Sequence, residues 1–342
     1  MSDVLVLMAV RFPESLVQRV RAVSPRLVIE HRTAQTLDEL GDALREVEVL
    51  YTTGLMPSPE QAPALKWVQG HFAGVERFLD HPLLKSVVLT TSSGIHAPAM
   101  AEYILMMMLA FAHHLPRMIE YHKRAEWPHG RWDLFAPREL RGTTVGIVGY
   151  GSVGREVARL AKAFGMRVLA TKRDLTRVTD EGWRLPEVGD PLTQSVDRLY
   201  PAETLRAMLG ECDYVVLTVP LTPATHGLIG AEELACMKSD AVLINVARGG
   251  VVDEAALVEA LRAGTMRGAA LDVFAEEPLP AASPLWTLPN VILSPHVSGF
   301  TLDYDERAMA LFAENLRRYV AGEPLLNVVD VTRDIDGVGA FN

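Results

Sequence analysis

The chain alternates short apolar runs of strand length with stretches in which apolar residues recur at helical spacing. In the first hundred residues the apolar runs cover residues 4–10, 27–29, 47–51, 66–69 and 87–91. The stretches 13–23 and 37–44 place their apolar side chains on one helical face. Because strands that alternate with helices form parallel sheets with covered faces, this part predicts one compact α/β unit.

A long apolar helix is predicted next, over residues 98–115, with consecutive methionines from Met106 to Met108. Methionines at such a place are more typical of a core or a subunit interface than of a ligand site. The segment that follows, 122–137, contains Trp127 and Trp132 and has no clear period. We therefore expect an arm that lies over another surface.

The same alternation starts again at residue 143 and predicts a second α/β unit. Its apolar runs cover residues 145–148, 167–171, 214–219, 241–246, 268–273 and 291–293, and helices are expected between them, one over 254–263. Residues 174–202 are rich in charge, proline and glycine and predict a loop longer than compact domains usually need. A final helix over 305–321 is expected to return and pack on the N-terminal unit.

Three glycines directly after the run 145–148 stand at the spacing G-x-G-x-x-G. Gly149 allows the tight turn from strand to helix, Gly151 lets a pyrophosphate approach the backbone, and Gly154 lets the helix pack close to the strand. The amide groups and the positive dipole end of that helix attract phosphate. A glycine-rich turn without a ligand is the alternative, but the strand before it and the helix after it favour dinucleotide binding.

These patterns predict the fold class α/β with two doubly wound parallel-sheet domains. Residues 1–98 and 299–342 are expected to form a flavodoxin-like substrate domain. Residues 99–298 are expected to form a Rossmann dinucleotide-binding domain that is inserted into it. In such folds ligands bind at the carboxyl ends of the strands.

Composition and charge narrow the classes of function. The 342 residues carry a formal net charge of −10 without a basic block, so we expect no nucleic-acid or membrane partner. Cys212, Cys236 and the ten histidines show no metal-ligand spacing, so we expect neither a metal nor a disulfide framework. The sequence shows no signal peptide and no apolar run long enough to span a bilayer, and a cytoplasmic protein is expected.

The charge at the end of the second strand of the second unit bears on the choice of cofactor. A carboxylate usually stands there and accepts hydrogen bonds from the adenosine ribose. Here Lys172 and Arg173 hold the position, and two cations attract a 2′-phosphate. NADP(H) is therefore favoured, while Asp174 is close enough to keep NAD(H) possible.

Polar side chains with catalytic potential follow three further apolar runs. Arg248 stands in NVARGGVVDEAAL, Asp272 and Glu277 stand in ALDVFAEEPL, and His296 stands in ILSPHVSG. Taken alone, each has an ordinary explanation as a loop residue or a surface charge. Because the carboxyl ends of parallel strands meet at one edge of a sheet, we expect these side chains to face the bound dinucleotide together.

With the glycine turn and TVPLTPAT, these segments resemble the D-isomer-specific 2-hydroxyacid dehydrogenase family over nearly the whole chain, most strongly from residue 101 to 299. The resemblance implies catalytic roles for Arg248, Glu277 and His296. The residues expected above to bind the cofactor are Gly149, Gly151, Gly154, Lys172 and Arg173. The resemblance implies further cofactor contacts from Ser152, Val153, Val219, Pro220, Thr225, Val246, Ala247, Arg248, Asp272, His296 and Gly299. Substrate contacts are expected from Arg248, His296, Ala73 and Gly74, the last two in a turn whose amides hold the substrate carboxylate.

The chemistry of these residue types agrees with the resemblance. A histidine can give and take a proton near neutral pH, and a nearby carboxylate favours the protonated imidazole that reduction of a 2-oxo acid needs. An arginine can bind a carboxylate and stabilise the developing alkoxide. We therefore expect His296 to be the acid and base, Glu277 to be its partner and Arg248 to be the clamp.

The expected function is that of an NAD(P)-dependent oxidoreductase that interconverts a small 2-oxo acid and its D-2-hydroxy acid, with glyoxylate or hydroxypyruvate favoured. A homodimer is expected, because the family is usually dimeric and the helix over 101–112 and the tryptophan arm would suit an isologous interface. The alternative is a dinucleotide-sensing binding protein that resembles transcriptional co-repressors on the same scaffold. Turnover with 2-oxo acids distinguishes the two.

Overall fold

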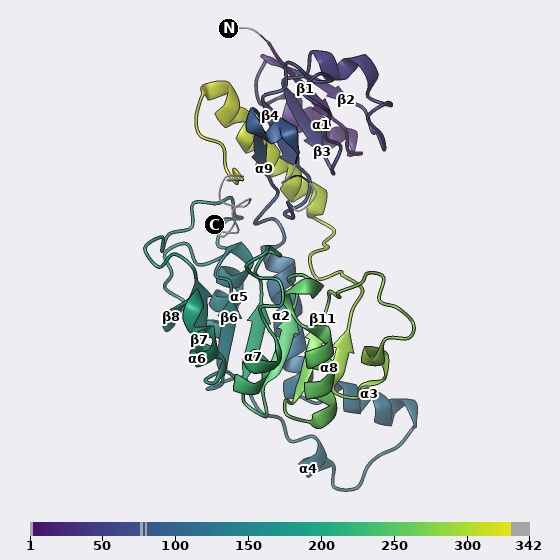
Figure 1. Cartoon of the computed structure of the whole chain (residues 1–342), viewed down its shortest axis with the longest axis vertical. Coiled ribbons are helices and arrows are strands. Elements are labelled where there is room, and N and C mark those ends of the chain that lie inside the picture. Colours follow the sequence, from purple (N-terminus) through teal and green to yellow (C-terminus); the bar gives the residue numbers. More distant parts are fainter. Residues whose placement is uncertain (1–2, 76–77, 79–80, 330–342) are drawn as a thin grey trace. The chain divides into compact units, whose positions relative to one another are not determined.

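The computed structural model describes residues 3–75, 78 and 81–329. Within them the chain forms two compact units, each built around its own parallel sheet (Figure 1). The first unit contains the described residues up to Ile95, the short segment Glu181–Leu185 and the described residues from Thr301 onward. The second unit contains His96–Asp180 and Pro186–Phe300.

The first unit is a five-stranded parallel sheet in the order β2-β1-β3-β4-β5. Its strands are β1 (Val4–Met8), β2 (Leu27–His31), β3 (Val49–Thr52), β4 (Trp67–Gly70) and β5 (Val88–Thr90). The helices α1 (Glu14–Arg21) and α9 (Tyr304–Ala321) pack on one face, and the 3₁₀ turns η1 (Gly41–Arg45) and η2 (Pro82–Lys85) pack on the other. The final helix thus packs on the N-terminal unit, as the sequence predicts.

Alternation along the strands explains why this sheet has two covered faces. On β1 the side chains of Val6 and Met8 join the core beneath α1 and α9, while Leu7 joins the core beneath the 3₁₀ turns. Successive side chains of a strand point to opposite faces, so a strand covered on both sides must be apolar throughout. The continuous run that begins at Val4 meets this requirement.

The expectation of a helix over residues 37–44 is wrong. The chain forms only the 3₁₀ turn η1 there, with Leu40 and Leu44 buried in the core. Gly41 has a φ of +52°, which lies outside the right-handed helical region, so an α-helix cannot run through it. The spacing of the apolar residues therefore reflects their burial and not a helix.

The second unit is a seven-stranded parallel sheet in the order β12-β11-β10-β9-β6-β7-β8. Its strands are β6 (Thr144–Val148), β7 (Arg167–Lys172), β8 (Arg198–Pro201), β9 (Tyr214–Leu217), β10 (Val242–Asn245), β11 (Gly268–Leu271) and β12 (Val291–Leu293). One face carries α2 (Ala97–Ala112) and α5 (Ser152–Ala163). The other carries α6 (Leu205–Leu209), α7 (Ala231–Cys236) and α8 (Glu254–Ala263).

Two short helices follow α2 in the second unit, namely α3 (Leu115–Lys123) and α4 (Arg131–Leu134), and neither contains a buried residue. The loop that carries α4 extends away from the sheet of this unit (Figure 1). Trp127 and Trp132 are 83% and 77% exposed on it. The segment is therefore an arm, but its tryptophans are uncovered, so the described part of its unit does not show the expected packing over another surface.

The long segment 174–202 has a buried polar anchor. Arg155, on α5 and only 1% exposed, donates hydrogen bonds to the carbonyl oxygens of Val178 and Asp190 and to Thr193 Oγ1. The carboxylate of Asp190 accepts hydrogen bonds from the Tyr150 hydroxyl and from two backbone amides of its own turn. A buried arginine whose donors are satisfied fixes this segment on the start of α5.

Candidate active site

The glycine turn after β6 has no room for side chains at two of its positions. Gly149 has a φ of +98°, and a Cβ atom built on it would lie 2.8 Å from Val219 Cγ1. A Cβ atom on Gly154 would lie 2.4 Å from the carbonyl oxygen of Gly149. Gly151 caps α5, whose first-turn amides at Ser152 and Val153 have no acceptor within the helix. This turn fits the pyrophosphate of a dinucleotide.

The end of β7 carries the two predicted cations. Lys172 and Arg173 are both half-buried. Burial and the neighbouring charge of Arg155 lower the pKa of the Lys172 ammonium group. The carboxylate of Asp174 turns toward Thr176, accepting from its amide at 2.9 Å and from its hydroxyl at 2.6 Å. Asp174, the carboxylate that could accept hydrogen bonds from the ribose of NAD(H), is thus engaged by its own turn.

The loop after β9 is closed by hydrogen bonds of its own polar side chain. After β9, Thr225 donates a hydrogen bond to the carbonyl oxygen of Pro220 at 2.6 Å and accepts one from the amide of Thr222 at 2.8 Å. Val219, at the start of this loop, is buried against the glycine turn. The loop that follows β9 is thereby held in one conformation beside Gly149.

Asn245, the last residue of β10, sets the path of the Arg248 loop. Its side chain is 1% exposed, accepts a hydrogen bond from the Ala247 amide at 3.0 Å and donates one to the carbonyl oxygen of Arg248 at 3.1 Å. Val246 and Ala247 are buried, and the Arg248 guanidinium group donates to the carbonyl oxygen of Ala247 at 2.8 Å. Asn245 could not be recognised from the sequence, because a polar residue at a strand end has no pattern of its own.

The loops of Arg248 and Glu277 are pressed together. Gly249 opens the 3₁₀ turn η4 (Gly249–Val251), and a Cβ atom on it would lie 1.8 Å from the carbonyl carbon of Phe274 and 2.3 Å from the Ala275 amide nitrogen. Phe274 in turn donates its amide hydrogen to Glu277 Oε1 at 3.0 Å. The backbone contact at Gly249 therefore places the Arg248 loop against the turn that orients Glu277.

His296 and Glu277 are in direct contact, as the sequence predicts. His296 Nδ1 lies 2.7 Å from Glu277 Oε2, and the two side chains are 47% and 36% exposed. One carboxylate oxygen is thus held by the backbone and the other by the imidazole, which leaves Nε2 of His296 as the ring nitrogen that Glu277 does not engage. A histidine fixed in this way can exchange a proton with a ligand.

Asp272 is fully buried behind this pair. Its carboxylate accepts hydrogen bonds from the Ser294 hydroxyl and from the amides of Val297 and Ser298, and its carbonyl oxygen accepts one from the His296 amide. Gly299, the next residue, lies beside His96. The structure thus shows Asp272 organising the turn of His296, and its contact with a nicotinamide stays a prediction.

The predicted residues fall in both units. Those expected to bind the cofactor or to act on the substrate carbonyl lie in the second unit, at the glycine turn or at the carboxyl ends of β7, β9, β10, β11 and β12. Ala73 and Gly74 lie in the first unit, in the loop that follows β4. That loop is tied to its sheet, since the His71 amide donates to Thr52 and the Ser92 amide donates to Phe72.

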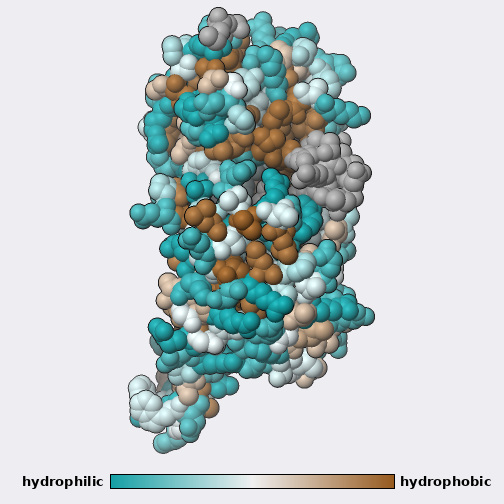
Figure 2. Space-filling view, turned by 90° about the vertical axis from the view of Figure 1, so that its left-hand side faces the viewer, coloured by the Kyte–Doolittle hydropathy of each residue, from teal (hydrophilic) through white to brown (hydrophobic). Residues whose placement is uncertain are grey.

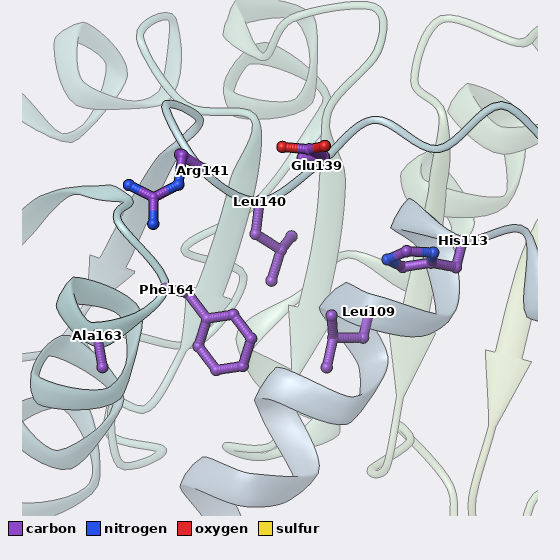
Figure 3. Close-up of a pocket in the computed structure, with 7 residues that line it drawn as sticks. All are labelled: Leu109, His113, Glu139, Leu140, Arg141, Ala163 and Phe164. Atoms are coloured by element: carbon purple, nitrogen blue, oxygen red, sulfur yellow. The ribbon is translucent and has the colours of Figure 1, made fainter.

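A separate cavity lies away from these residues. It has a volume of about 300 Å³ and is lined by Leu109, His113, Glu139, Leu140, Arg141, Ala163 and Phe164 (Figure 3). None of the predicted site residues lines it. Across the described ranges no group of three or more His, Cys, Asp or Glu side chains could hold a metal ion, and no helix there is long and apolar enough to cross a membrane.

The structure combines a doubly wound sheet, a turn in which two positions accept only glycine, and a histidine–carboxylate pair at neighbouring strand ends. This is the arrangement of a dinucleotide-dependent oxidoreductase. The family model described as "D-isomer specific 2-hydroxyacid dehydrogenase, NAD binding domain" matches residues 105–298. The chain belongs to the D-isomer specific 2-hydroxyacid dehydrogenase family. It is an NAD(P)-dependent enzyme that transfers hydride between the cofactor and 2-oxo or 2-hydroxy acids.

Two curated relatives illustrate the family. The chain is 35% identical over 269 residues to a glyoxylate reductase of Thermococcus gammatolerans, covering 77% of this chain and 76% of that protein. It is 33% identical over 308 residues to a D-3-phosphoglycerate dehydrogenase of Methanocaldococcus jannaschii, covering 89% of this chain. The match spans 55% of that longer relative.

A solved structure shows the same likeness in three dimensions. An NADPH-dependent glyoxylate/hydroxypyruvate reductase from Sinorhizobium meliloti, in complex with NADP and sulfate, is similar with a TM-score of 0.78 at 29% identity. The likeness covers 96% of this chain and 99% of that one. These relatives give no support to the co-repressor-like alternative.

Proposed function

We propose that the enzyme reduces glyoxylate and hydroxypyruvate with NADPH, and that His296, Glu277 and Arg248 carry the reaction. The observation that supports this most is the 2.7 Å contact between His296 and Glu277 at the carboxyl end of the second sheet. Relatives named as reductases of these two small 2-oxo acids support the choice of substrate.

In the proposed reaction the substrate carbonyl gains a hydride at carbon and a proton at oxygen. A reduced nicotinamide held at the glycine turn would supply the hydride when it is bound. His296 donates the proton from Nε2, and the negative charge of Glu277 at Nδ1 stabilises the protonated imidazole that must be present before the transfer. Arg248 binds the substrate and stabilises the negative charge that develops on the carbonyl oxygen. The reverse reaction uses the same groups, with His296 as the base.

The substrate carboxylate is proposed to bind to backbone amides of Ala73 and Gly74. Small residues at both positions leave the amides accessible, since no bulky side chain of their own covers them. The loop is fixed at its start, where the Tyr304 hydroxyl donates to the carbonyl oxygen of His71 and the Tyr51 hydroxyl lies 2.9 Å from His71 Nδ1. A fixed loop offers its amides to the carboxylate without a cost of ordering at binding.

NADP(H) is proposed as the preferred cofactor, with the 2′-phosphate bound by Lys172 and Arg173. The local bonds of Asp174 to Thr176 support this, because they hold Oδ1 of the carboxylate that follows the two cations. Replacing Lys172 and Arg173 together by alanine is expected to lower kcat/KM for NADPH about tenfold or more and to change kcat/KM for NADH less than twofold. Equal losses with both cofactors would contradict the proposed site.

A homodimer is proposed, in which a second copy of this chain covers α2, α3 and the arm. Met106 on α2 is half exposed, and the apolar side chains Leu115, Met118 and Ile119 of α3 are all exposed. Leu109, about one turn beyond Met106 on α2, and His113, the residue that caps this helix, line the cavity of Figure 3. Large apolar side chains that are exposed on neighbouring helices favour an interface.

A cytoplasmic location is also kept as a proposal. Cys212 and Cys236 are both free thiols, which suits a reducing compartment. Fractionation of the source cells with an antibody to the protein tests this. Recovery in the cytosolic fraction is expected, and recovery outside the cytosol would contradict it.

The proposed function is tested by following oxidation of NADPH and NADH at 340 nm with glyoxylate, hydroxypyruvate, pyruvate and bulkier 2-oxo acids. The highest kcat/KM is expected for NADPH with glyoxylate or hydroxypyruvate, and hydroxypyruvate is expected to give the D product. A preference for NADH above tenfold, for a bulky oxo acid, or for the L product would contradict the corresponding part of the proposal.

A further inference from the structure

The turn that presents His296 is held in a conformation that few residues adopt. His296 has a φ of +54°, in the left-handed region that strains a non-glycine residue. Its amide donates to the carbonyl oxygen of Asp272 at 2.8 Å. The Asp272 carboxylate accepts from the amides of Val297 and Ser298, each at 2.9 Å. Asp272 therefore compensates the strain in this turn.

The register of the second sheet places Ser294 beside the Asp272 carboxylate. Leu271 of β11 pairs with Leu293 of β12, so that Asp272 and Ser294 leave the sheet side by side. The Ser294 hydroxyl donates to Asp272 Oδ1 at 2.5 Å. The fully buried carboxylate thus receives two backbone donors and one hydroxyl donor.

A third group extends this chain of hydrogen bonds onto α2. The Tyr103 hydroxyl lies 2.6 Å from Ser294 Oγ. Since the single hydrogen of Ser294 points to the carboxylate, its oxygen accepts, and Tyr103 is the donor. Burial and the negative charge of Asp272 raise the pKa of Tyr103 to about 12, so the phenol keeps its hydrogen at neutral pH. Successive donors that end on an anion strengthen one another.

We propose that Tyr103 is a positioning residue for hydride transfer, which acts through Ser294 to fix the Asp272 carboxylate and so the turn that presents His296. The inference rests on the proposed role of His296 as the proton donor. It assigns a part in the geometry of the active site to α2, a helix that packs on one face of the second sheet. Neither Tyr103 nor Ser294 needs to touch substrate or cofactor for this role.

The test compares Tyr103→Phe, Ser294→Ala, the double variant and Ser294→Thr. Tyr103→Phe and Ser294→Ala are each expected to lower kcat five- to tenfold and to leave KM for NADPH within twofold. The double variant is expected to be no slower than Ser294→Ala, because both changes break one chain. Ser294→Thr keeps the hydroxyl and is expected to restore wild-type kcat. Tyr319→Phe is the control, since its hydroxyl donates to Glu48 in the first unit.

Three results would overturn the inference. An unchanged kcat in Tyr103→Phe would show that the phenol only packs. Multiplied losses in the double variant would show that the two hydroxyls act separately. A KM for NADPH that rises in step with the loss of kcat would show that the loss comes from weaker cofactor binding and not from the turn of His296.

A readout that needs no turnover separates this inference from the proposed function. The imidazole proton between His296 and Glu277 is expected to give a downfield proton resonance that His296→Gln abolishes. That resonance is expected to stay sharp in Tyr319→Phe and to broaden or vanish in Tyr103→Phe. If it is unchanged in Tyr103→Phe the inference fails. If the wild type reduces no 2-oxo acid, the proposed function fails while this resonance still decides the role of Tyr103.

Discussion

The absence of a side chain at residue 249 decides how closely two loops of the candidate active site approach each other. Gly249 lies against the backbone of Phe274 and Ala275, where even a methyl group would overlap main-chain atoms. Gly250, the next residue, faces side-chain atoms, because a Cβ atom on it would lie 3.3 Å from the flexible end of Leu221 and 3.7 Å from the His226 ring. Two adjacent glycines thus differ in what an added methyl group would meet.

Gly249→Ala is therefore expected to push the Arg248 loop away from the Glu277 turn. We expect a loss of stability of about 1–3 kcal/mol, as for overpacked sites, with a fall in kcat/KM of tenfold or more. Gly250→Ala is the matched control and should change both quantities little. Thermal unfolding and steady-state kinetics check this, and equal effects of the two substitutions would contradict the packing argument.

The charge of Glu277 is expected to matter more than its shape. Glu277→Gln keeps the side-chain size and removes the negative charge beside His296 Nδ1, so the protonated imidazole loses its stabilisation. We expect kcat for reduction to fall at least tenfold, with KM for NADPH unchanged. Glu276→Gln, at the exposed neighbouring position, should be close to wild type. Steady-state kinetics decide, and similar kcat values for the two variants would refute the role of Glu277.

Residues that act on the candidate site differ in how visible they are in the sequence. Gly149, Gly154, Glu277 and His296 stand in recognisable spacings at predicted strand ends, and the structure confirms the contact of His296 with Glu277. Asn245 is missed, because a polar residue at a strand end has no pattern of its own. Ser294 and Tyr103 are missed, because they act through hydrogen bonds between elements that are distant in the chain. Such contacts depend on strand register and helix packing, which local patterns do not encode.

At the scale of elements, the segment 174–202 also has features that local sequence patterns do not encode. Its length and polarity correctly predict an irregular segment, but its end forms the edge strand β8, which is not predicted. Only Tyr200 of that strand is buried, and Pro201 ends it, so it has no apolar run. The anchor at Arg155 is likewise hidden, because an arginine after the glycine turn reads as a solvated helix residue.

Arg155→Met is expected to loosen this segment. The substitution leaves the carbonyl oxygens of Val178 and Asp190 without their donor, at a cost of about 1–3 kcal/mol each when buried. We expect a lower melting temperature, faster proteolysis within 174–196 and a higher KM for NADPH, because Lys172 and Arg173 directly precede this segment. Arg262→Met, an exposed change on α8, is the control. Unchanged proteolysis would show that the anchor is dispensable.

At the scale of the whole molecule, the surface is not uniformly polar. Hydrophobic residues gather in patches on the face drawn in Figure 2, among side chains that are mostly hydrophilic. Large exposed apolar side chains include Met106, Met118, Ile119, Trp127 and Trp132 on α2, α3 and the arm. Their exposure in a single chain is the basis of the proposed homodimer.

Replacing Trp127 and Trp132 together by serine is expected to weaken that dimer. Sedimentation at micromolar concentration should show twice the monomer mass for the wild type and a shift toward monomer for the double variant. Trp286→Ser removes another exposed tryptophan, outside the arm, and should leave the mass unchanged. A wild-type enzyme that sediments as a monomer would contradict the homodimer.

The central claim is that His296 supplies the proton while the cofactor supplies the hydride. It is tested most directly by measuring kcat for NADPH oxidation with glyoxylate in the wild type and in His296→Gln, together with NADPH binding by fluorescence. We predict a loss in kcat of about a hundredfold or more with NADPH affinity within twofold of wild type. A His296→Gln enzyme that turns over at the wild-type rate would contradict the account.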